Sequence, residues 1–268
     1  MKPVSKTAYY TAGVRMLDAQ RRKPICGDTF AHVFMNGQGM EVLQKIKHIA
    51  SARIVAVQRH AVIDKLLQQY LRENPRTKIF IVGAGFDTRA YRLQGGVWIE
   101  ADEPEVIQQK EELLPAATAP NSLQRIAINF ASEKISEKLN DFASDEKVII
   151  VLEGVSMYLT DEQFSYTLQQ FKQLFPKHLL ICDLLTQQFF SRYSYRLHKK
   201  LKDFGAVFQF KHKVPQNFVL QHGYLLQQKI SVIQAGIDEG NLPIPKFLQW
   251  LFQHDIQHGY TVNVFENS

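Results

Sequence analysis

The spacing of hydrophobic positions changes once along the chain, near residue 75. Between Met40 and Arg72, apolar residues recur every three or four positions, as one face of an amphipathic helix requires. Asn74-Pro75 ends this stretch, because the residue before a proline disfavours the helical conformation. We therefore predict a helical N-terminal extension over residues 1–75.

After residue 75, short apolar runs alternate with helical patterns, and buried parallel strands have such runs. Strands are predicted at Lys78–Val82, Val97–Asp102, Arg125–Phe130, Lys147–Leu152, Leu179–Cys182, Leu225–Val232 and Tyr260–Phe265. Helices are predicted at Glu103–Leu114, Asp161–Phe175, Pro215–His222 and Pro245–His254. Strands alternating with helices predict an α/β fold built on an open parallel sheet.

Residues 187–215 interrupt this alternation. They are rich in aromatic and basic residues, and no strand pattern is visible in them. We interpret them as a lid inserted over the edge of the sheet. The predicted organisation is an N-terminal extension (1–75) followed by one core domain (76–268) that carries this lid.

Composition and charge exclude several classes of protein. The chain of 268 residues is 45% hydrophobic and 22% charged, which is typical of a globular protein and not of a disordered chain. No apolar leader and no long uncharged apolar stretch are visible, so we expect a cytoplasmic protein without a membrane partner. The net charge of +6 suits an anionic ligand, but its basic clusters are small, so a nucleic-acid partner is not favoured.

Candidate chemistry lies where the predicted strands end, because open α/β sheets bind ligands at the carboxyl ends of their strands. Gly83-Ala84-Gly85 follows the first strand, and glycine lets a backbone turn tightly against a ligand. Asp102 ends the next strand, where a carboxylate can accept hydrogen bonds from both hydroxyls of a ribose. The pair predicts a cofactor that contains adenosine.

Two features of the glycine turn select among such cofactors. Thr88 stands where the dinucleotide-binding pattern has its third glycine, which disfavours NAD and FAD. Asp87 lies in the turn itself and would repel a pyrophosphate. S-adenosylmethionine has a ribose, no phosphate and positive charges, so it fits best.

Three motifs resemble one family. Residues 81–93 are similar to the Gly-Ala-Gly-x-Asp-Thr-Arg-x-x-Arg-Leu signature of the leucine carboxyl methyltransferase family, which includes bacterial polyketide O-methyltransferases. Residues 98–110 resemble its Trp-x-Glu-x-Asp-x-Pro-x-Val stretch with the following lysine, and residues 152–159 its Glu-Gly-x-x-x-Tyr-Leu motif. The resemblance implies the class I methyltransferase fold, a Rossmann-like seven-stranded sheet whose last strand is antiparallel.

The resemblance also implies roles. Arg59 should pair with the carboxylate of the cofactor, and Glu153 should lie along the cofactor below the transfer site. Asn129-Phe130 stands where the family usually has Asp-Leu, and it could bind adenine through an amide oxygen and a stacked ring. The full cofactor-binding set that we predict is Arg59, Gly83, Ala84, Gly85, Asp87, Asp102, Asn129, Phe130 and Glu153.

The acceptor side is less defined. We predict Tyr158 and Arg192 as catalytic residues, because Arg192 could hold an acceptor carboxylate through two hydrogen bonds. Other candidates over the pocket are Tyr9, Tyr10, Arg15, Tyr193 and Tyr195. His60 is the histidine that we would test as a base, whereas Arg89 and Arg92 should serve the turn structurally. We expect no metal.

The sequence thus predicts an S-adenosylmethionine-dependent O-methyltransferase. Its acceptor would be a carboxylate or a hydroxyl of a small molecule. Two alternatives stay open: a methyltransferase for the C-terminal carboxylate of a protein or peptide, and a non-catalytic protein that binds S-adenosylmethionine.

Overall fold

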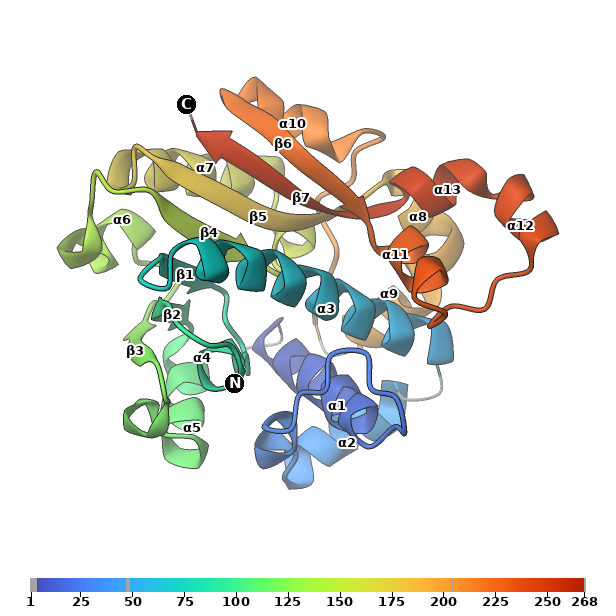
Figure 1. Ribbon diagram of the computed structural model, residues 1–268, viewed down its shortest axis with the longest axis horizontal. Helices are drawn as coiled ribbons and strands as arrows, with labels where there is room; N and C mark the ends of the chain where they lie inside the picture. The colour runs from blue at the N-terminus through green and yellow to red at the C-terminus, as the bar shows by residue number, and fades with distance from the viewer. Residues whose placement is uncertain (1–3, 47–48, 204, 268) are drawn as a thin grey trace.

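A computed structural model describes residues 4–46, 49–203 and 205–267, and its centre is a seven-stranded sheet (Figure 1). The strand order is β3-β2-β1-β4-β5-β7-β6. The strands are β1 (Lys78–Val82), β2 (Val97–Asp102), β3 (Ser122–Ala127), β4 (Val148–Leu152), β5 (His178–Leu185), β6 (Tyr224–Ser231) and β7 (Tyr260–Asn267). Strands β1 to β5 are parallel, and β7 runs antiparallel to both β5 and β6. The predicted sheet with an antiparallel last strand is confirmed.

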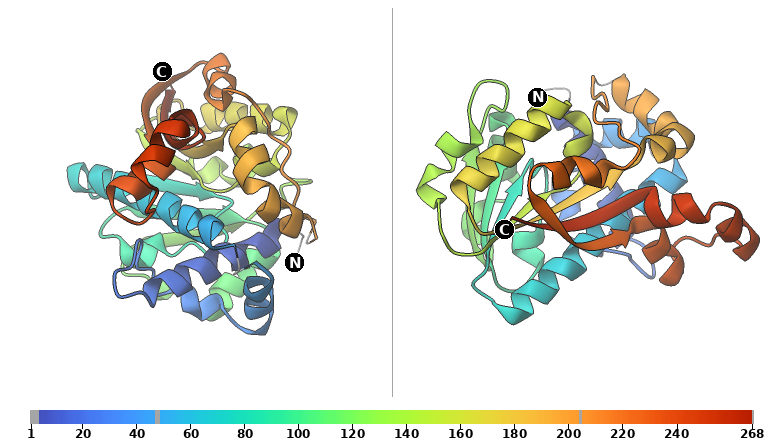
Figure 2. Two further views of the ribbon diagram at one scale, coloured as in Figure 1. Left: turned by 90° about the vertical axis from the view of Figure 1, so that its right-hand side faces the viewer. Right: turned by 90° about the horizontal axis from the view of Figure 1, so that it is seen from above.

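Strand alternation divides the core into two clusters. Ile79 and Ile81 of β1 point to one face, where they join apolar side chains of the N-terminal helices, whereas Phe80 and Val82 point to the other face. The second face is covered by helix α7 (Asp161–Leu174), whose N-terminus is fixed by a capping box between Thr160 and Gln163. Helices therefore cover both faces of the sheet, as Figures 1 and 2 show.

The helices of the extension differ from the prediction. The periodic stretch Met40–Arg72 is not one helix but belongs to two, α2 (Gly37–Ile46) and α3 (Ala50–Glu73), and residues 47–48 between them lie outside the described residues. Ile49, the residue before α3, has ψ 78°, which is not helical. Helix α1 (Thr7–Ala19) packs against both.

The remaining helices are short and lie in the segments between the strands. The segment predicted as one helix at Pro245–His254 contains two, and the helix that follows β6 directly was not predicted. The helices are α4 (Arg89–Arg92), α5 (Pro104–Leu113), α6 (Ile135–Lys138), α8 (Gln187–Phe189), α9 (Tyr195–Lys202), α10 (Pro215–Gln221), α11 (Val232–Asp238), α12 (Lys246–Leu251) and α13 (Gln253–His258).

Strand β3 lies earlier in the sequence than predicted. Its register with β2 joins Val97 to Ser122 and Asp102 to Ala127, so the strand ends before Asn129. The prediction of Arg125–Phe130 was therefore shifted by three residues. The reason is that pairing with β2 sets where β3 begins, and a short apolar run in the sequence does not indicate the register of that pairing.

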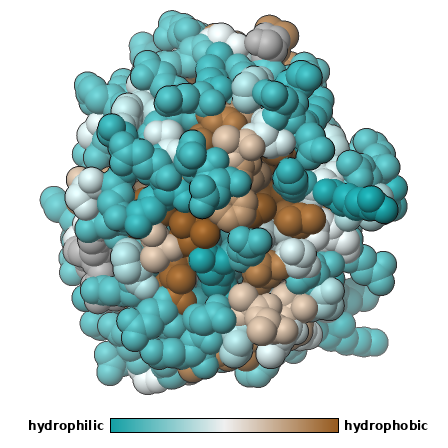
Figure 3. Space-filling view, turned by 90° about the vertical axis from the view of Figure 1, so that its left-hand side faces the viewer, coloured by the Kyte–Doolittle hydropathy of each residue, from teal (hydrophilic) through white to brown (hydrophobic). Residues whose placement is uncertain are grey.

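One face of the molecule is mostly polar. Figure 3 shows this face, on which hydrophobic side chains form a central band and hydrophilic ones occupy most of the rest. Across the described part of the chain, no helix combines the length and the apolar character needed to span a bilayer.

Candidate active site

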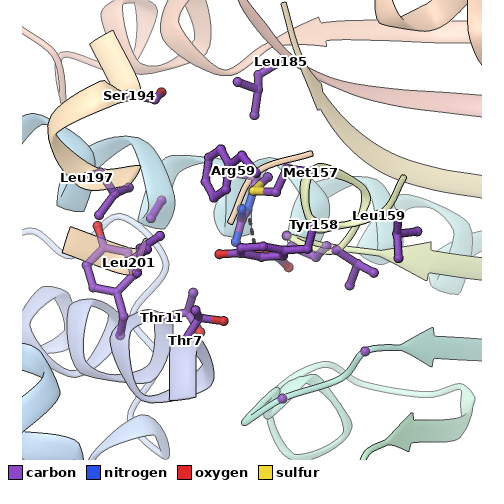
Figure 4. Close-up of a pocket in the computed structure, with 18 of the residues that line it drawn as sticks. Thr7, Thr11, Arg59, Met157, Tyr158, Leu159, Leu185, Ser194, Leu197 and Leu201 are labelled. Atoms are coloured by element: carbon purple, nitrogen blue, oxygen red, sulfur yellow. Dashed lines mark hydrogen bonds and ion pairs between the residues drawn. The ribbon is translucent and has the colours of Figure 1, made fainter. Parts of the chain in front are cut away.

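A cavity of about 1360 Å³ opens at the carboxyl ends of β1, β2 and β4. One part of its wall is made by the turns that follow these strands. Further lining comes from α1, α3, α7, residues 189–209 and the segment between Ile233 and Tyr260. Figure 4 shows part of this lining. Ligand pockets of proteins usually measure about 300–1,000 Å³, so this cavity has room for more than one small molecule.

The glycine turn after β1 lies against the cavity because its glycines have no side chain. Gly83 has φ +73° and Gly85 has φ +49°, conformations that other residues rarely adopt. A Cβ atom at Gly83 would lie 2.5 Å from Val155 Cγ2, so there is no space for one. Any larger residue at Gly83 would therefore displace Val155 or distort the turn.

Asp102, at the end of β2, faces the same turn. One of its carboxylate oxygens accepts the Gly85 N–H at 2.5 Å and the other accepts the Glu103 N–H at 2.6 Å. Burial raises the pKa of Asp102 to about 6, although these backbone N–H groups oppose the rise. A carboxylate has about four sites for hydrogen bonds, so Asp102 can accept further donors from a ligand in the cavity.

Arg89, the first residue of α4, holds a buried cluster of acids behind the turn. Its guanidinium donates to Asp64 at 2.6 Å, to Asp87 at 2.5 Å and to Glu153 at 2.6 Å, and its side chain is fully buried. Burial would lower the pKa of Arg89, but the three carboxylates outweigh it and raise this pKa well above its ordinary value. The ion pair of Arg89 with Asp87 agrees with the structural role in the turn that the sequence predicted for Arg89.

His60, Asp87 and Glu153 lie close enough together to resemble a metal site. However, Arg89 donates hydrogen bonds to both carboxylates and lies 2.8 Å from His60 Nδ1. Burial and the charge of Arg89 lower the pKa of His60. His60 is absent from the described cavity lining, so its position does not favour a role as a base.

Arg59 joins the ends of β4 and β5. Its guanidinium lies 3.1 Å from Glu153 and 3.2 Å from Asp183, and it donates to the Tyr260 hydroxyl at 2.9 Å. Burial alone would raise the pKa of Glu153, but Arg89, His60 and Arg59 hold it well below its usual range. Arg59 and Glu153 both line the cavity, yet each already has partners within the chain.

Asn129 and Phe130 follow β3 directly, and they differ in their position relative to the cavity. The Asn129 side-chain oxygen accepts the Ala131 N–H at 3.2 Å, and Asn129 does not appear in the described lining, whereas Phe130 does. Because β3 ends earlier than predicted, Asn129 shapes the turn. An adenine contact from its amide oxygen would have to share that oxygen with Ala131.

The other half of the cavity is largely apolar. Tyr158 points into it in Figure 4, and its ring packs edge-on against Phe208 with 5.1 Å between the ring centres. Burial raises the pKa of Tyr158 to about 12, so its hydroxyl stays protonated. Leu185, Leu197 and Leu201 lie in the same view.

Arg192 lines this half of the cavity but is already paired. It lies 2.7 Å from Asp255, a buried carboxylate that also accepts from Gln188 and Tyr193. A bidentate contact from Arg192 to an acceptor would compete with this pair. Of the other candidates, Tyr10, Arg15, Tyr193 and Tyr195 line the cavity, whereas Tyr9 is not in its described lining.

The charges around the cavity differ from those of the whole chain. The described lining contains three arginines and six carboxylates, although the chain carries a net charge of +6. Each of the three arginines, Arg15, Arg59 and Arg192, is paired with a carboxylate. The lining therefore suits a cationic ligand better than the net charge suggested.

A family model described as leucine carboxyl methyltransferase matches residues 8–172, which include the carboxyl ends of β1, β2, β3 and β4. The chain belongs to the leucine carboxyl methyltransferase family. As a member, it is an S-adenosylmethionine-dependent methyltransferase.

Individual relatives are distant. The tetracenomycin polyketide synthesis O-methyltransferase TcmP of Streptomyces glaucescens is 23% identical over 207 residues, which are 75% of this chain and 74% of TcmP. The S-adenosylmethionine-dependent methyltransferase dpfgK of Gibberella zeae is 24% identical over 170 residues, which are 59% of this chain and 57% of dpfgK. The matched residues of this chain thus span little more than half of dpfgK.

Solved structures share the fold. A DUF574 family protein from Streptomyces avermitilis aligns with a TM-score of 0.65 at 12% identity, over 96% of this chain and 97% of that one. Magnesium protoporphyrin IX methyltransferase from Synechocystis, crystallised with S-adenosylhomocysteine, aligns with a TM-score of 0.52 at 11% identity, over 88% and 96%. The class I methyltransferase fold predicted from the motifs is confirmed.

The residues of this family member fit the cofactor. The glycine turn lines the cavity at positions where an added Cβ atom would crowd Val155 or Ala8, and Asp102 has hydrogen-bonding capacity left beside it. The acidic lining suits a sulfonium. We expect Asp102 to accept hydrogen bonds from ribose hydroxyls.

This arrangement predicts a pH dependence of cofactor binding. A protonated Asp102 accepts ribose hydroxyls less well, so the affinity for S-adenosylhomocysteine should be constant above about pH 7 and should fall below the pKa of about 6. The fall should approach about tenfold per pH unit. Calorimetric titration from pH 5 to pH 8 measures it. Asp102→Asn should remove the slope, and an unchanged slope in that variant would assign it to another group.

Three contributors to the site were not singled out as functional from the sequence. Asp183 anchors Arg59, Tyr260 donates to Asp183 at 2.6 Å, and Asp255 holds Arg192. Asp183 follows the predicted fifth strand, so the rule about strand ends could have found it. Tyr260 and Asp255 carry no motif, and only the antiparallel return of β7 brings Tyr260 to the site.

Proposed function

We propose that this chain transfers a methyl group from S-adenosylmethionine to an oxygen atom of a small-molecule acceptor. The observation that carries the proposal is that one cavity joins the glycine turn and Asp102 to a large apolar chamber. S-adenosylmethionine supplies a methyl group that is already activated by its sulfonium. The tasks left to the chain are binding, alignment and exclusion of water.

Each half of the cavity would take one of these tasks. Gly83 and Gly85 would line the methionine part of the cofactor and Asp102 its ribose, and the carboxylates of the cavity lining would favour its positive charge. The 187–215 segment would act as the lid over the acceptor, because apolar residues of this segment line the other half of the cavity. Among relatives, TcmP is named a polyketide O-methyltransferase, which agrees with an oxygen acceptor.

Calorimetry followed by an acceptor screen tests the proposal. S-adenosylmethionine and S-adenosylhomocysteine should bind saturably, and NAD, the control, should not. The screen then uses S-adenosylmethionine with a labelled methyl group, and its acceptors are 2-naphthoate, 2-naphthol and a peptide that ends in leucine.

The product identifies the acceptor group. A methyl ester releases methanol in base, whereas an aryl methyl ether does not. Transfer to the peptide alone would replace the small-molecule acceptor by a protein terminus. Cofactor binding without transfer to any acceptor, in this screen and in a wider one of phenols and carboxylates, would favour the non-catalytic alternative.

A further inference from the structure

Two adjacent tyrosines of α1 have opposite surroundings. The Tyr9 side chain packs against Phe86, and its hydroxyl is hydrogen-bonded to Gln38 and Gln109. Tyr10 lines the cavity and is only 4% exposed, and within the described part of the structure its hydroxyl has no hydrogen-bond partner. One hydroxyl is satisfied inside the protein and its neighbour is not.

A buried hydroxyl without a partner requires an explanation, because the large majority of buried polar groups are hydrogen-bonded. Tyr10 differs from a packing defect in that its side chain borders open space in which a ligand can lie. The positive charges of Arg59 and Arg53 act on the hydroxyl of Tyr10 and oppose the rise of its pKa. Burial raises the pKa of Tyr10, so the group is a neutral donor.

Two arginines of the cavity lining are already engaged. Arg59 is paired with Glu153 and Asp183, and Arg192 is paired with Asp255. Around them the wall is apolar and partly aromatic, with contributions from Tyr158, Phe189, Phe208 and Phe252. A ligand in this half would meet ring faces, paired charges and one buried hydroxyl that still lacks a partner.

We propose that Tyr10 is an acceptor-binding residue, whose O–H donates a hydrogen bond to an oxygen of an apolar, ring-bearing acceptor. This inference rests on the proposed function, because the acceptor must lie beside the bound cofactor. A phenolic hydroxyl and an aromatic carboxylate share the required chemistry, an oxygen with lone pairs on an apolar ring. The probe 2-naphthol represents the phenolic hydroxyl, and 2-naphthoate represents the aromatic carboxylate.

The test compares Tyr10→Phe with Tyr9→Phe, a matched control on the same helix. Thermal unfolding is measured without ligands, and binding of each naphthalene probe is measured by calorimetry in saturating S-adenosylhomocysteine. Tyr10→Phe should unfold at the same temperature as the wild type or higher, because it removes a hydroxyl that lacks a partner. Its affinity for the bound probe should fall about three- to tenfold, as expected for one lost hydrogen bond.

Tyr9→Phe should show the reverse. It loses two internal hydrogen bonds, so its unfolding temperature should fall while its probe affinity stays that of the wild type. S-adenosylhomocysteine should bind all three proteins equally. The probe that responds to Tyr10→Phe distinguishes a hydroxyl acceptor from a carboxylate acceptor.

Two results would overturn the inference. Tyr10→Phe could lower the unfolding temperature and leave probe binding unchanged, which would make Tyr10 a structural residue. The wild type could also bind S-adenosylhomocysteine and neither probe, which would reject an apolar ring-bearing acceptor but leave the cofactor site intact. Failure to bind S-adenosylhomocysteine would instead reject the proposed function itself.

Discussion

Replacing Arg89 with methionine should lower the free energy of unfolding by about 3–5 kcal/mol, the cost of removing one partner from a buried ion pair. Methionine keeps the length and apolar stem of the side chain, but it leaves Asp64, Asp87 and Glu153 without their shared cation. Proteins are stable by only about 5–15 kcal/mol, so a large part of the total would be lost. Urea denaturation followed by circular dichroism measures the change.

The matched control is Lys65→Met. The Lys65–Glu239 pair has the same 2.6 Å separation as the pair between Arg89 and Glu153, but the Lys65 side chain is 60% exposed. Exposed pairs contribute about 0–1 kcal/mol, so this variant should unfold almost like the wild type. Equal losses in both variants would show that burial of the Arg89 cluster does not matter to stability.

Asp102→Ala should weaken the binding of S-adenosylhomocysteine by about 1–3 kcal/mol, which is roughly 5- to 150-fold. The variant removes the proposed acceptor for the ribose hydroxyls. It also leaves the Gly85 N–H without its carboxylate partner, which loosens the glycine turn. Calorimetric titration near pH 7.5, where Asp102 is ionised, measures the loss directly.

A carboxylate elsewhere on the following helix provides the control. Glu112 of α5 is exposed, lies outside the described cavity lining and is hydrogen-bonded to Gln108. Glu112→Ala should bind S-adenosylhomocysteine with the affinity of the wild type. If Asp102→Ala also binds normally, the ribose is held by another group, and the assignment of the β2 end is wrong.

The sheet could be predicted because its strands carry local signals. The run Lys78–Val82 is apolar on both faces and ends at a glycine turn, a pattern typical of a central parallel strand. The shift of β3 could not be predicted, because its register depends on β2 and not on its own residues. The break between α2 and α3 was missed for a related reason, since both helices keep an apolar face and the period continues across the junction.

The site was predictable where function and strand ends coincide. Gly83, Gly85, Asp102 and Glu153 all line the cavity, and each lies in a family motif. The sequence does not reveal which charges neutralise one another, because Arg59 and Asp183 are 124 positions apart and meet only through the fold. For the same reason, the missing partner of the Tyr10 hydroxyl could not be inferred from its neighbours along the chain.

The division of the cavity wall bears on how such enzymes diverge. The turns after β1, β2 and β4 lie inside the part that matches the family, residues 8–172. The part of the apolar wall that runs from Leu185 to Tyr260 lies beyond it. Mutations in that later part can accumulate without touching the ends of β1, β2 and β4, so descendants of one ancestor can keep the same methyl donor while they come to accept different substrates.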